Sequence, residues 1–366
     1  MAVIMDLLCR NMVSRSWLSL AEGSCHRASC CLSTVRSKDR IPWYQTQLEV
    51  NEKVTKSRFS PLSKRVSILR DPGVVTVDRL SKEKIFQLLG DNVVYRKDPL
   101  LVISKPQGFS VTGNQDEVSL SSLLPELQQH LGIRGDLHIV KAAPKESSGH
   151  VLLSTCHVTT KRIEEFYGLC RKKQRPVATY CAVTVGVPSQ AEGEIKAALK
   201  VEQIEDLRLV VPVTNPSKGS LEKREVKRAE TRYKVLDSNQ GCALVQLQPM
   251  SVYQAQLLVH VTLMFCRILG DHTYSARIGK VLGENVFLPV ETALPRTQML
   301  DEGTLHRMHF SQQQMHRMPL HLHLHQLLIP GQSPREQELL TAPPPPYFQR
   351  TLQLLGLKMS EQLQSV

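Results

Sequence analysis

Short apolar runs separated by turn residues predict a series of strands and helices between residues 98 and 335. Residues 100–103 form a continuous apolar run and residues 177–185 a β-branched one, so both predict buried strands. Apolar positions at helical spacing predict helices over residues 122–130 and 163–170. The pattern indicates a folded domain, and the chain is long enough to bury a sizeable core.

The second half of this domain continues the pattern. Two strands are predicted at residues 231–236 and 243–247, with a turn at residues 239–241 between them. A longer helix is predicted over residues 251–268, because Ser251 is a good N-cap and apolar residues then recur along one face. These elements are expected to belong to the same domain.

The centre of the domain is a polar loop between two apolar runs. The first run covers residues 137–140, and the second covers residues 150–153. The loop between them carries Pro144 and ends in Ser-Ser-Gly at residues 147–149. This order predicts a strand, a loop and a second strand.

Three histidines, His321, His323 and His325, alternate with leucines. Strict alternation places all three on one face of a predicted strand. Three imidazoles can bind zinc, but neighbouring side chains on one strand seldom complete a tetrahedral site. We therefore expect a structural role for them and no metal site.

The chain carries a formal net charge of +12, and the excess is concentrated in residues 1–97. A basic chain suits an acidic partner such as nucleic acid, although charge of this kind also serves solubility. The nine cysteines form no C-x-x-C pair, which argues against a disulfide scaffold and a structural zinc site. The five cysteines from Cys156 onward are expected to be buried thiols.

The two ends of the chain differ in composition from the domain. Residues 1–40 are rich in arginine and serine with dispersed apolar residues, which predicts a mitochondrial transit peptide; a disordered tail is the alternative. Residues 41–97 are expected to form a basic linker and a helix that begins at Ser81. Residues 336–366 form a predicted Pro-rich C-terminal extension. No apolar run approaches the roughly 18 residues of a membrane span, so none is expected.

The central loop resembles the signature of the RluA-type RNA pseudouridine synthases, His-Arg-Leu-Asp-x-x-Thr-Ser-Gly. The end of the signature matches residues 147–149. Its Asp, the catalytic carboxylate of the family, falls on Pro144, and its Arg and Leu fall on Ala142 and Ala143. The chain therefore has the end of the motif and lacks its acid.

Three further motifs in the family's order extend the resemblance over about residues 98–330. Residues 105–108 resemble the first motif, Asn-Lys-Pro-x-Gly. Residues 178–186 resemble the third, and its base-stacking tyrosine corresponds to Tyr180. Residues 252–274 resemble the fourth, which ends in Gly-Asp-x-x-Tyr.

One departure in the fourth motif accompanies the missing acid. The arginine that pairs with the catalytic Asp in the family is replaced by Leu258. A buried arginine without its carboxylate would cost about 3–5 kcal/mol, so an apolar replacement is the stable one. We therefore interpret Pro144 and Leu258 as the coupled loss of an acid and its counter-ion.

The resemblance implies an α+β protein with the pseudouridine synthase fold, a mixed, largely antiparallel sheet with flanking helices and loops. In the family reaction the C1′–N1 bond of a uridine breaks, the uracil turns, and C5 joins the sugar. The reaction needs no cofactor. With the predicted transit peptide, the resemblance implies action on mitochondrial mRNA or rRNA in the matrix, in support of mitochondrial translation.

Two classes of function remain open. In the first, the chain is a pseudouridine synthase whose displaced acid is Glu146, in the same loop. In the second, it is a catalytically inactive RNA-binding factor in mitochondrial RNA processing or ribosome assembly. In both, Lys105, Lys141 and Lys145 are expected to contact RNA, because the family places their loops beside it.

Overall fold

The computed structural model describes residues 67–71, 74, 80–113, 118–331, 333 and 336–359. The predicted transit peptide and the first part of the basic linker lie outside these residues. Within the described part of the chain, no helix combines the length and apolar character needed to span a membrane.

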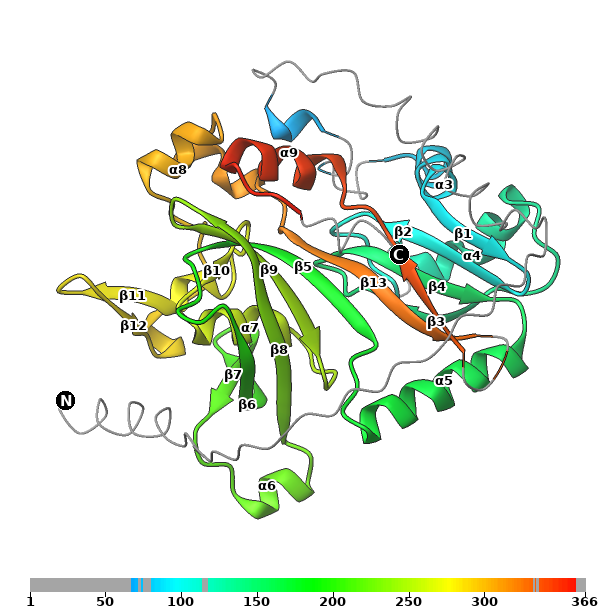
Figure 1. Cartoon of the computed structure of the whole chain (residues 1–366), viewed down its shortest axis with the longest axis horizontal. Helices are drawn as coiled ribbons and strands as arrows, with labels where there is room; N and C mark the ends of the chain where they lie inside the picture. The colour runs from blue at the N-terminus through cyan, green and yellow to red at the C-terminus, as the bar shows by residue number, and fades with distance from the viewer. Residues whose placement is uncertain are drawn as a thin grey trace, which may run out of the picture. The chain divides into compact units, whose positions relative to one another are not determined.

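A large sheet organises the described residues, and a two-stranded hairpin lies apart from it. The main path of the sheet runs β1-β2-β4-β13-β5-β9-β8-β6-β7, while β3, β10 and β14 pair with β4, β5 and β13. All neighbours are antiparallel except β4 and β13, so the predicted mixed, largely antiparallel sheet is confirmed (Figure 1). The sheet strands are β1 Val93–Lys97, β2 Leu100–Lys105, β3 His138–Ala142, β4 Ser148–Ser154, β5 Ala178–Val185, β6 Glu192–Ile204, β7 Leu207–Val213, β8 Val226–Asn239, β9 Cys242–Pro249, β10 Arg267–Ile268, β13 Leu322–Pro330 and β14 Gln337–Thr341. The hairpin is formed by β11 Ile278–Val281 and β12 Glu284–Phe287.

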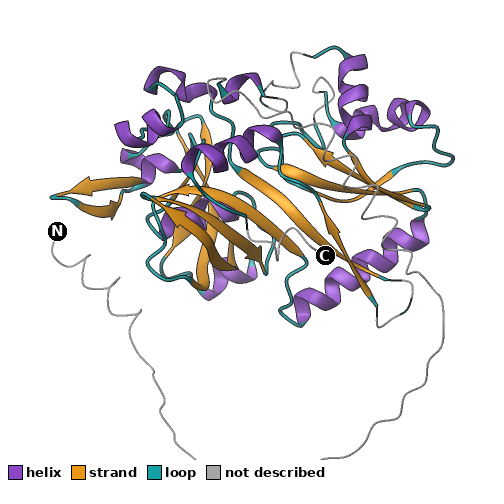
Figure 2. Cartoon of the chain, turned by 45° about the horizontal axis from the view of Figure 1, so that its top comes forward, coloured by secondary structure: helices purple, strands orange, loops and turns teal. Residues whose placement is uncertain are grey.

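Helices flank the sheet, as Figure 2 shows with helices in purple and strands in orange. The α-helices are α3 Lys82–Asp91, α4 Leu120–His130, α5 His157–Lys172, α6 Lys218–Glu222, α7 Gln256–Leu263, α8 Glu302–Arg307 and α9 Pro346–Leu355. Short 3-10 turns are η1 Ile68–Arg70, η3 Ser275–Arg277, η4 Val290–Thr292 and η5 Gln312–Arg317.

The central strand β5 is buried on both faces. Tyr180 and Ala182 point into one apolar cluster, which includes residues of α5 and α7. Cys181 and Val183 point into a second cluster, which includes residues of α9. Burial on both faces explains why β5 has the continuous β-branched and apolar sequence that identified it.

Two motif glycines allow close backbone approaches. Gly149 has φ +117°, and a Cβ there would lie 2.3 Å from the carbonyl oxygen of Leu324 on β13. Gly270 has φ +84°, and a Cβ there would lie 2.2 Å from the carbonyl oxygen of Pro319. Only glycine fits such positions, so these two motif glycines are required by packing.

Most elements predicted from the apolar pattern are confirmed. The central stretch is the antiparallel pair β3 and β4, and the helix predicted over residues 163–170 is α5. The turn between β8 and β9 has positive φ at Gln240 and Gly241, as a two-residue hairpin requires. Among the five later cysteines, Cys156 is only partly buried, so that expectation is wrong for it.

The helix predicted over residues 251–268 is wrong in both bounds. It is α7, which covers only Gln256–Leu263 and has Ala255, not Ser251, at its N-cap. The Ser251 hydroxyl instead accepts a hydrogen bond from the Glu230 N–H at 3.0 Å, which ties the segment to β8. After α7, the residues of β10 form a strand instead of continuing the helix, because they pair with β5.

The sheet continues past both expected boundaries of the domain. Upstream of residue 98, β1 pairs with β2, and downstream of residue 335, β14 pairs with β13. Farther upstream, Asp71 and Arg350 of α9 form an ion pair at 2.7 Å, and both side chains are buried. The folded unit therefore includes residues 80–97 of the expected linker and residues 336–359 of the expected extension.

The three alternating histidines of this region connect β13 to the residues that follow β14, by hydrogen bonds to Ala342 and Thr351. All three are buried. His321 Nε2 lies 2.8 Å from Thr351 Oγ1, and His323 Nε2 and His325 Nδ1 donate to the Ala342 carbonyl at 3.0 and 2.7 Å. These contacts support the predicted structural role.

Candidate functional site

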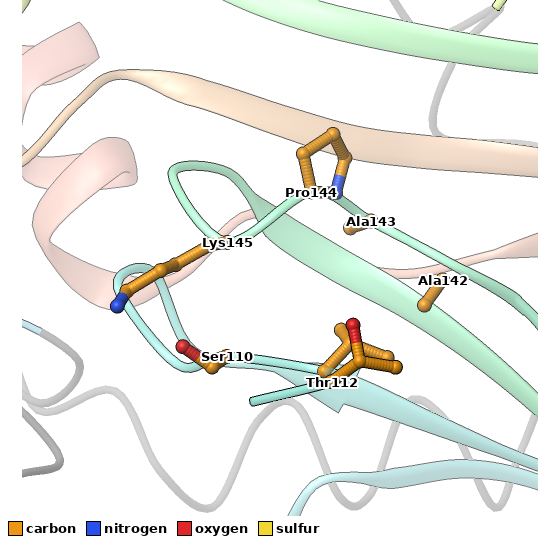
Figure 3. Close-up of a pocket in the computed structure, with 7 residues that line it drawn as sticks. Ser110, Thr112, Ala142, Ala143, Pro144 and Lys145 are labelled. Carbon is orange, nitrogen blue, oxygen red and sulfur yellow. The ribbon is translucent and has the colours of Figure 1, made fainter. Parts of the chain in front are cut away.

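A pocket of about 340 Å³ lies beside the central loop. One wall is the loop that joins β3 to β4, and the other follows the turn after β2. Figure 3 shows Ser110 and Thr112 opposite the chain that carries Pro144 and Lys145. The lining residues are Ser110, Val111, Thr112, Ala142, Ala143, Pro144 and Lys145.

Lys105 joins the two walls from the interior of the protein. Its side chain is 1% exposed. Its ammonium group donates to the carbonyls of Ser147 at 2.8 Å, Pro106 and Phe109 at 3.1 Å, and Lys145 at 3.3 Å. Burial lowers its pKa to about 7, although the charge of Glu146 acts in the opposite direction. The ammonium therefore faces backbone carbonyls inside the protein, and its predicted contact with RNA stays a prediction.

The positions of the family's acid and its arginine differ in burial. Pro144 is exposed on the pocket wall. Leu258 on α7 is 7% exposed and lies in the same buried cluster as Ala143, to which Pro144 does not belong. The expectation of a buried apolar pair at these two positions is thus not met, because the proline faces solvent.

Glu146 occupies the turn between Lys145 and Ser147 and is partly buried. Burial is the main cause of the raised pKa of Tyr180, and the charge of Glu146 adds to it. Burial also raises the pKa of Tyr274, where the charges of Asp271 and Glu146 act in the same direction. The charge of Glu146 therefore acts on the pKa of residues from the first, third and fourth motifs.

Tyr180 lies in the middle of β5, opposite Leu324 of β13 and Leu247 of β9. Only 7% of the residue is exposed. Little of the ring is open to a nucleobase in this structure, so stacking on a base requires movement of the surrounding side chains.

The other two lysines lie nearer the surface. Lys141 on β3 is partly buried, and its Nζ is 5.3 Å from the centre of the Tyr167 ring. Burial lowers the pKa of Lys141, and Arg171 at the end of α5 adds to the effect. Lys145 is exposed and lines the pocket, which makes it the best placed of the three for a phosphate.

One wall of the pocket was not identified from the sequence, and Asp271 was expected only as a member of the fourth motif. The wall at residues 110–112 directly follows the first motif, and that proximity was the available signal. Asp271 is 3% exposed; its Oδ1 accepts the N–H groups of Thr273 and Tyr274 at 2.9 Å, and its Oδ2 has no partner among the described residues. Burial raises the pKa of Asp271 to about 6.

The comparisons with known proteins agree with this arrangement. A family model described as RNA pseudouridylate synthase matches residues 99–262. The human "Mitochondrial mRNA pseudouridine synthase RPUSD3" is 50% identical over 282 residues, which cover 76% of this chain and 80% of the relative. The mouse "Pseudouridylate synthase RPUSD4, mitochondrial" is 31% identical over 340 residues, which cover 89% of this chain and 81% of the relative.

The fold is also that of a solved relative. The structure of "Human RNA Pseudouridylate Synthase Domain Containing 4" aligns with a TM-score of 0.59 and 26% identity, covering 75% of this chain and 97% of the other. The names of the sequence relatives support a mitochondrial location for this protein. Identity of 50% over most of both chains shows that this chain belongs to the RNA pseudouridylate synthase family.

Proposed function

We propose that this protein isomerises uridine to pseudouridine in mRNA of the mitochondrial matrix, with Glu146 as its catalytic carboxylate. The relative with 50% identity is named for mitochondrial mRNA, which supports this substrate over rRNA. Support of mitochondrial translation follows from modification of its messengers.

The observation that carries the proposal is the position of Glu146. The carbonyls of the residues on either side of it accept hydrogen bonds from Lys105 Nζ, and Glu146 itself is partly buried in the loop so held. Its charge acts on Tyr180 and Tyr274, which come from two different motifs, and on Lys105, from a third. A carboxylate among these motifs can take the role that Pro144 cannot, since proline is neither a nucleophile nor a base.

The reaction is an isomerisation, so the atoms of the uridine are conserved. The C1′–N1 bond breaks, C5 of the turned uracil bonds to C1′, the C5 proton leaves, and N1 takes up a proton. Glu146 would act at the sugar, either by attacking C1′ or by removing a sugar proton, before the new bond forms. A flipped uridine must enter the site for this, at a cost of a few kcal/mol.

An inactive RNA-binding factor of mitochondrial RNA processing or ribosome assembly is the second candidate. The exposed Pro144 favours it, because the family's position for the acid carries no ionisable group.

Pseudouridine mapping of mitochondrial transcripts, in cells with and without this protein, separates the two candidates. The proposal predicts uridines whose modification disappears with the protein and returns with its re-expression. An unchanged map together with altered transcript processing would instead support the binding factor.

A further inference from the structure

Four cationic side chains gather where α5 ends. Arg171 and Lys172 lie in its last turn, Lys173 is its C-cap, and Arg175 follows shortly after. All four residues are exposed, and none of them forms an ion pair with another residue that the structure describes. We call these four residues the basic cap.

The basic cap holds more positive charge than the helix needs. Cations in the last turn stabilise the negative end of a helix, and Arg171 and Lys172 already do so. Residues 167–170, at helical spacing before the cap, are Tyr-Gly-Leu-Cys and offer no carboxylate for an ion pair along the helix. Burial and the charge of Arg171 both lower the pKa of Lys141, so the crowding of positive charge reaches β3. Like charges held together in this way repel one another and favour an anionic partner.

The backbone that carries the basic cap is ordered by hydrogen bonds. The Lys173 N–H donates to the Leu169 carbonyl at 3.0 Å, and the Arg175 N–H donates to the Cys170 carbonyl at 2.9 Å. Between them, Gln174 has a φ of +49°, which turns the chain out of the helix. The cations therefore stand on a fixed turn, which lowers the entropic cost of binding a partner.

The basic cap lies on the same side of the sheet as Tyr180. Tyr167 of α5 packs into the apolar cluster that also contains Tyr180. After the cap the chain leads directly into β5, which begins at Ala178 (Figure 1). Arg175 precedes Tyr180 by so few residues that their Cα atoms lie within about 18 Å of each other. An RNA whose target uridine occupies the candidate site can therefore reach the cap with its neighbouring phosphates.

We propose that the basic cap of α5 is an RNA-contact surface outside the candidate site, which binds phosphates of the nucleotides that flank the target uridine. Guanidinium and ammonium groups bind phosphates through charge-assisted hydrogen bonds. Such contacts position an RNA without reading its sequence. The four residues lie outside all four family motifs. The proposal rests on RNA as the substrate of the proposed function.

Fluorescence anisotropy of oligouridine and oligoadenosine, each long enough to extend past the site, tests this surface on the full chain over a range of salt concentrations. The cap variant combines Arg171→Gln, Lys172→Gln and Lys173→Gln. We expect it to bind both RNAs about tenfold more weakly than the wild type at low salt. The slope of log Kd against log salt concentration should fall by about 2, because each phosphate contact of a single strand contributes about 0.7.

The matched control combines Lys84→Gln, Lys97→Gln and Lys280→Gln, which remove as many exposed cations elsewhere. It should keep the wild-type slope. Equal weakening by the cap variant and the control would overturn the proposal, because the loss would then reflect net charge alone. Wild-type affinity in the cap variant, a loss confined to oligouridine, or no RNA binding by the wild type would overturn it as well.

Two further measurements keep the test decisive. If the cap variant does not fold, Lys172→Gln with Lys173→Gln keeps Arg171 at the helix end and should still lower the slope by about 1.4. Vesicles of phosphatidylcholine, with and without anionic phosphatidylglycerol, test a membrane surface as the partner. Loss of vesicle binding in the cap variant at unchanged RNA affinity would assign the cap to lipid and overturn the proposal.

The binding measurements involve no reaction, so their failure leaves pseudouridine formation untouched. Loss of modification in the Glu146 variant, in turn, leaves the salt dependence of RNA binding unaffected.

Discussion

Lys105 Nζ donates a 2.8 Å hydrogen bond to the carbonyl of Ser147, 42 residues along the chain. The bond joins the loop of the first motif to the loop that carries Pro144 and Glu146. With three more carbonyls around the same ammonium group, the lysine fixes the geometry of both loops. In this structure the lysine is part of the internal support of the site.

Lys105→Met should lower the free energy of unfolding by about 1–3 kcal/mol, because it leaves buried carbonyls without a donor. Chemical denaturation of the two proteins measures the difference. Lys97→Met, at an exposed lysine at the end of β1, is the control and should unfold as the wild type does. Equal stability of Lys105→Met and wild type would mean that the carbonyls do not depend on the lysine.

Asp271→Asn should change how stability depends on pH. The folded state holds a proton on Asp271 up to about pH 6, whereas the unfolded state releases it near 3.8. The folded state thus binds more protons in this window, so wild-type stability falls as pH rises through it. Asparagine keeps an oxygen for the N–H groups of Thr273 and Tyr274 and carries no charge.

The free energy of unfolding of Asp271→Asn should therefore rise relative to that of the wild type by up to about 3 kcal/mol as the pH increases from 4 to 7. Urea unfolding at several pH values measures this gain. A constant difference between the two proteins across the range would show that Asp271 titrates normally.

The buried pair of Asp71 and Arg350 should be essential for docking residues 67–71 on α9. Asp71→Asn should cost about 3–5 kcal/mol, because it leaves a buried guanidinium without its carboxylate. Adding Arg350→Met should restore part of the stability, since no uncompensated charge then remains. Additive losses in thermal unfolding would contradict this pairing.

Restoring the family's residue at Pro144 and at Leu258 should change the stability of the protein by very different amounts. Pro144→Asp should change stability by no more than about 1 kcal/mol, because the side chain is exposed. Leu258→Arg should cost about 3–5 kcal/mol, since the side chain is 7% exposed within an apolar cluster. Denaturation of both single variants and the double variant measures their coupling, and a large loss from Pro144→Asp alone would show that the loop is buried in solution.

The motifs could be located from the sequence because their residues resemble the family's motifs in the same order, beside apolar runs closed by a glycine or a turn. Gly149 is an example, since its close approach to Leu324 leaves no choice of residue. The direction of the Lys105 side chain could not be predicted, because a lysine in a turn has the same local sequence whether it faces solvent or four distant carbonyls. Strands β6 and β7 were missed because charged residues interrupt the apolar signal along β6. The pairing of β6 with both β7 and β8 orders them.

Glu146→Gln tests the central claim most directly. Cells that lack the endogenous protein would receive the wild type, Glu146→Gln, or Glu164→Gln as a control at an exposed position of α5. We expect pseudouridine mapping of mitochondrial mRNA to show every protein-dependent site with the wild type and the control, and none with Glu146→Gln, at equal RNA affinity. Unchanged modification with Glu146→Gln would contradict the account, because the reaction would then not depend on this carboxylate.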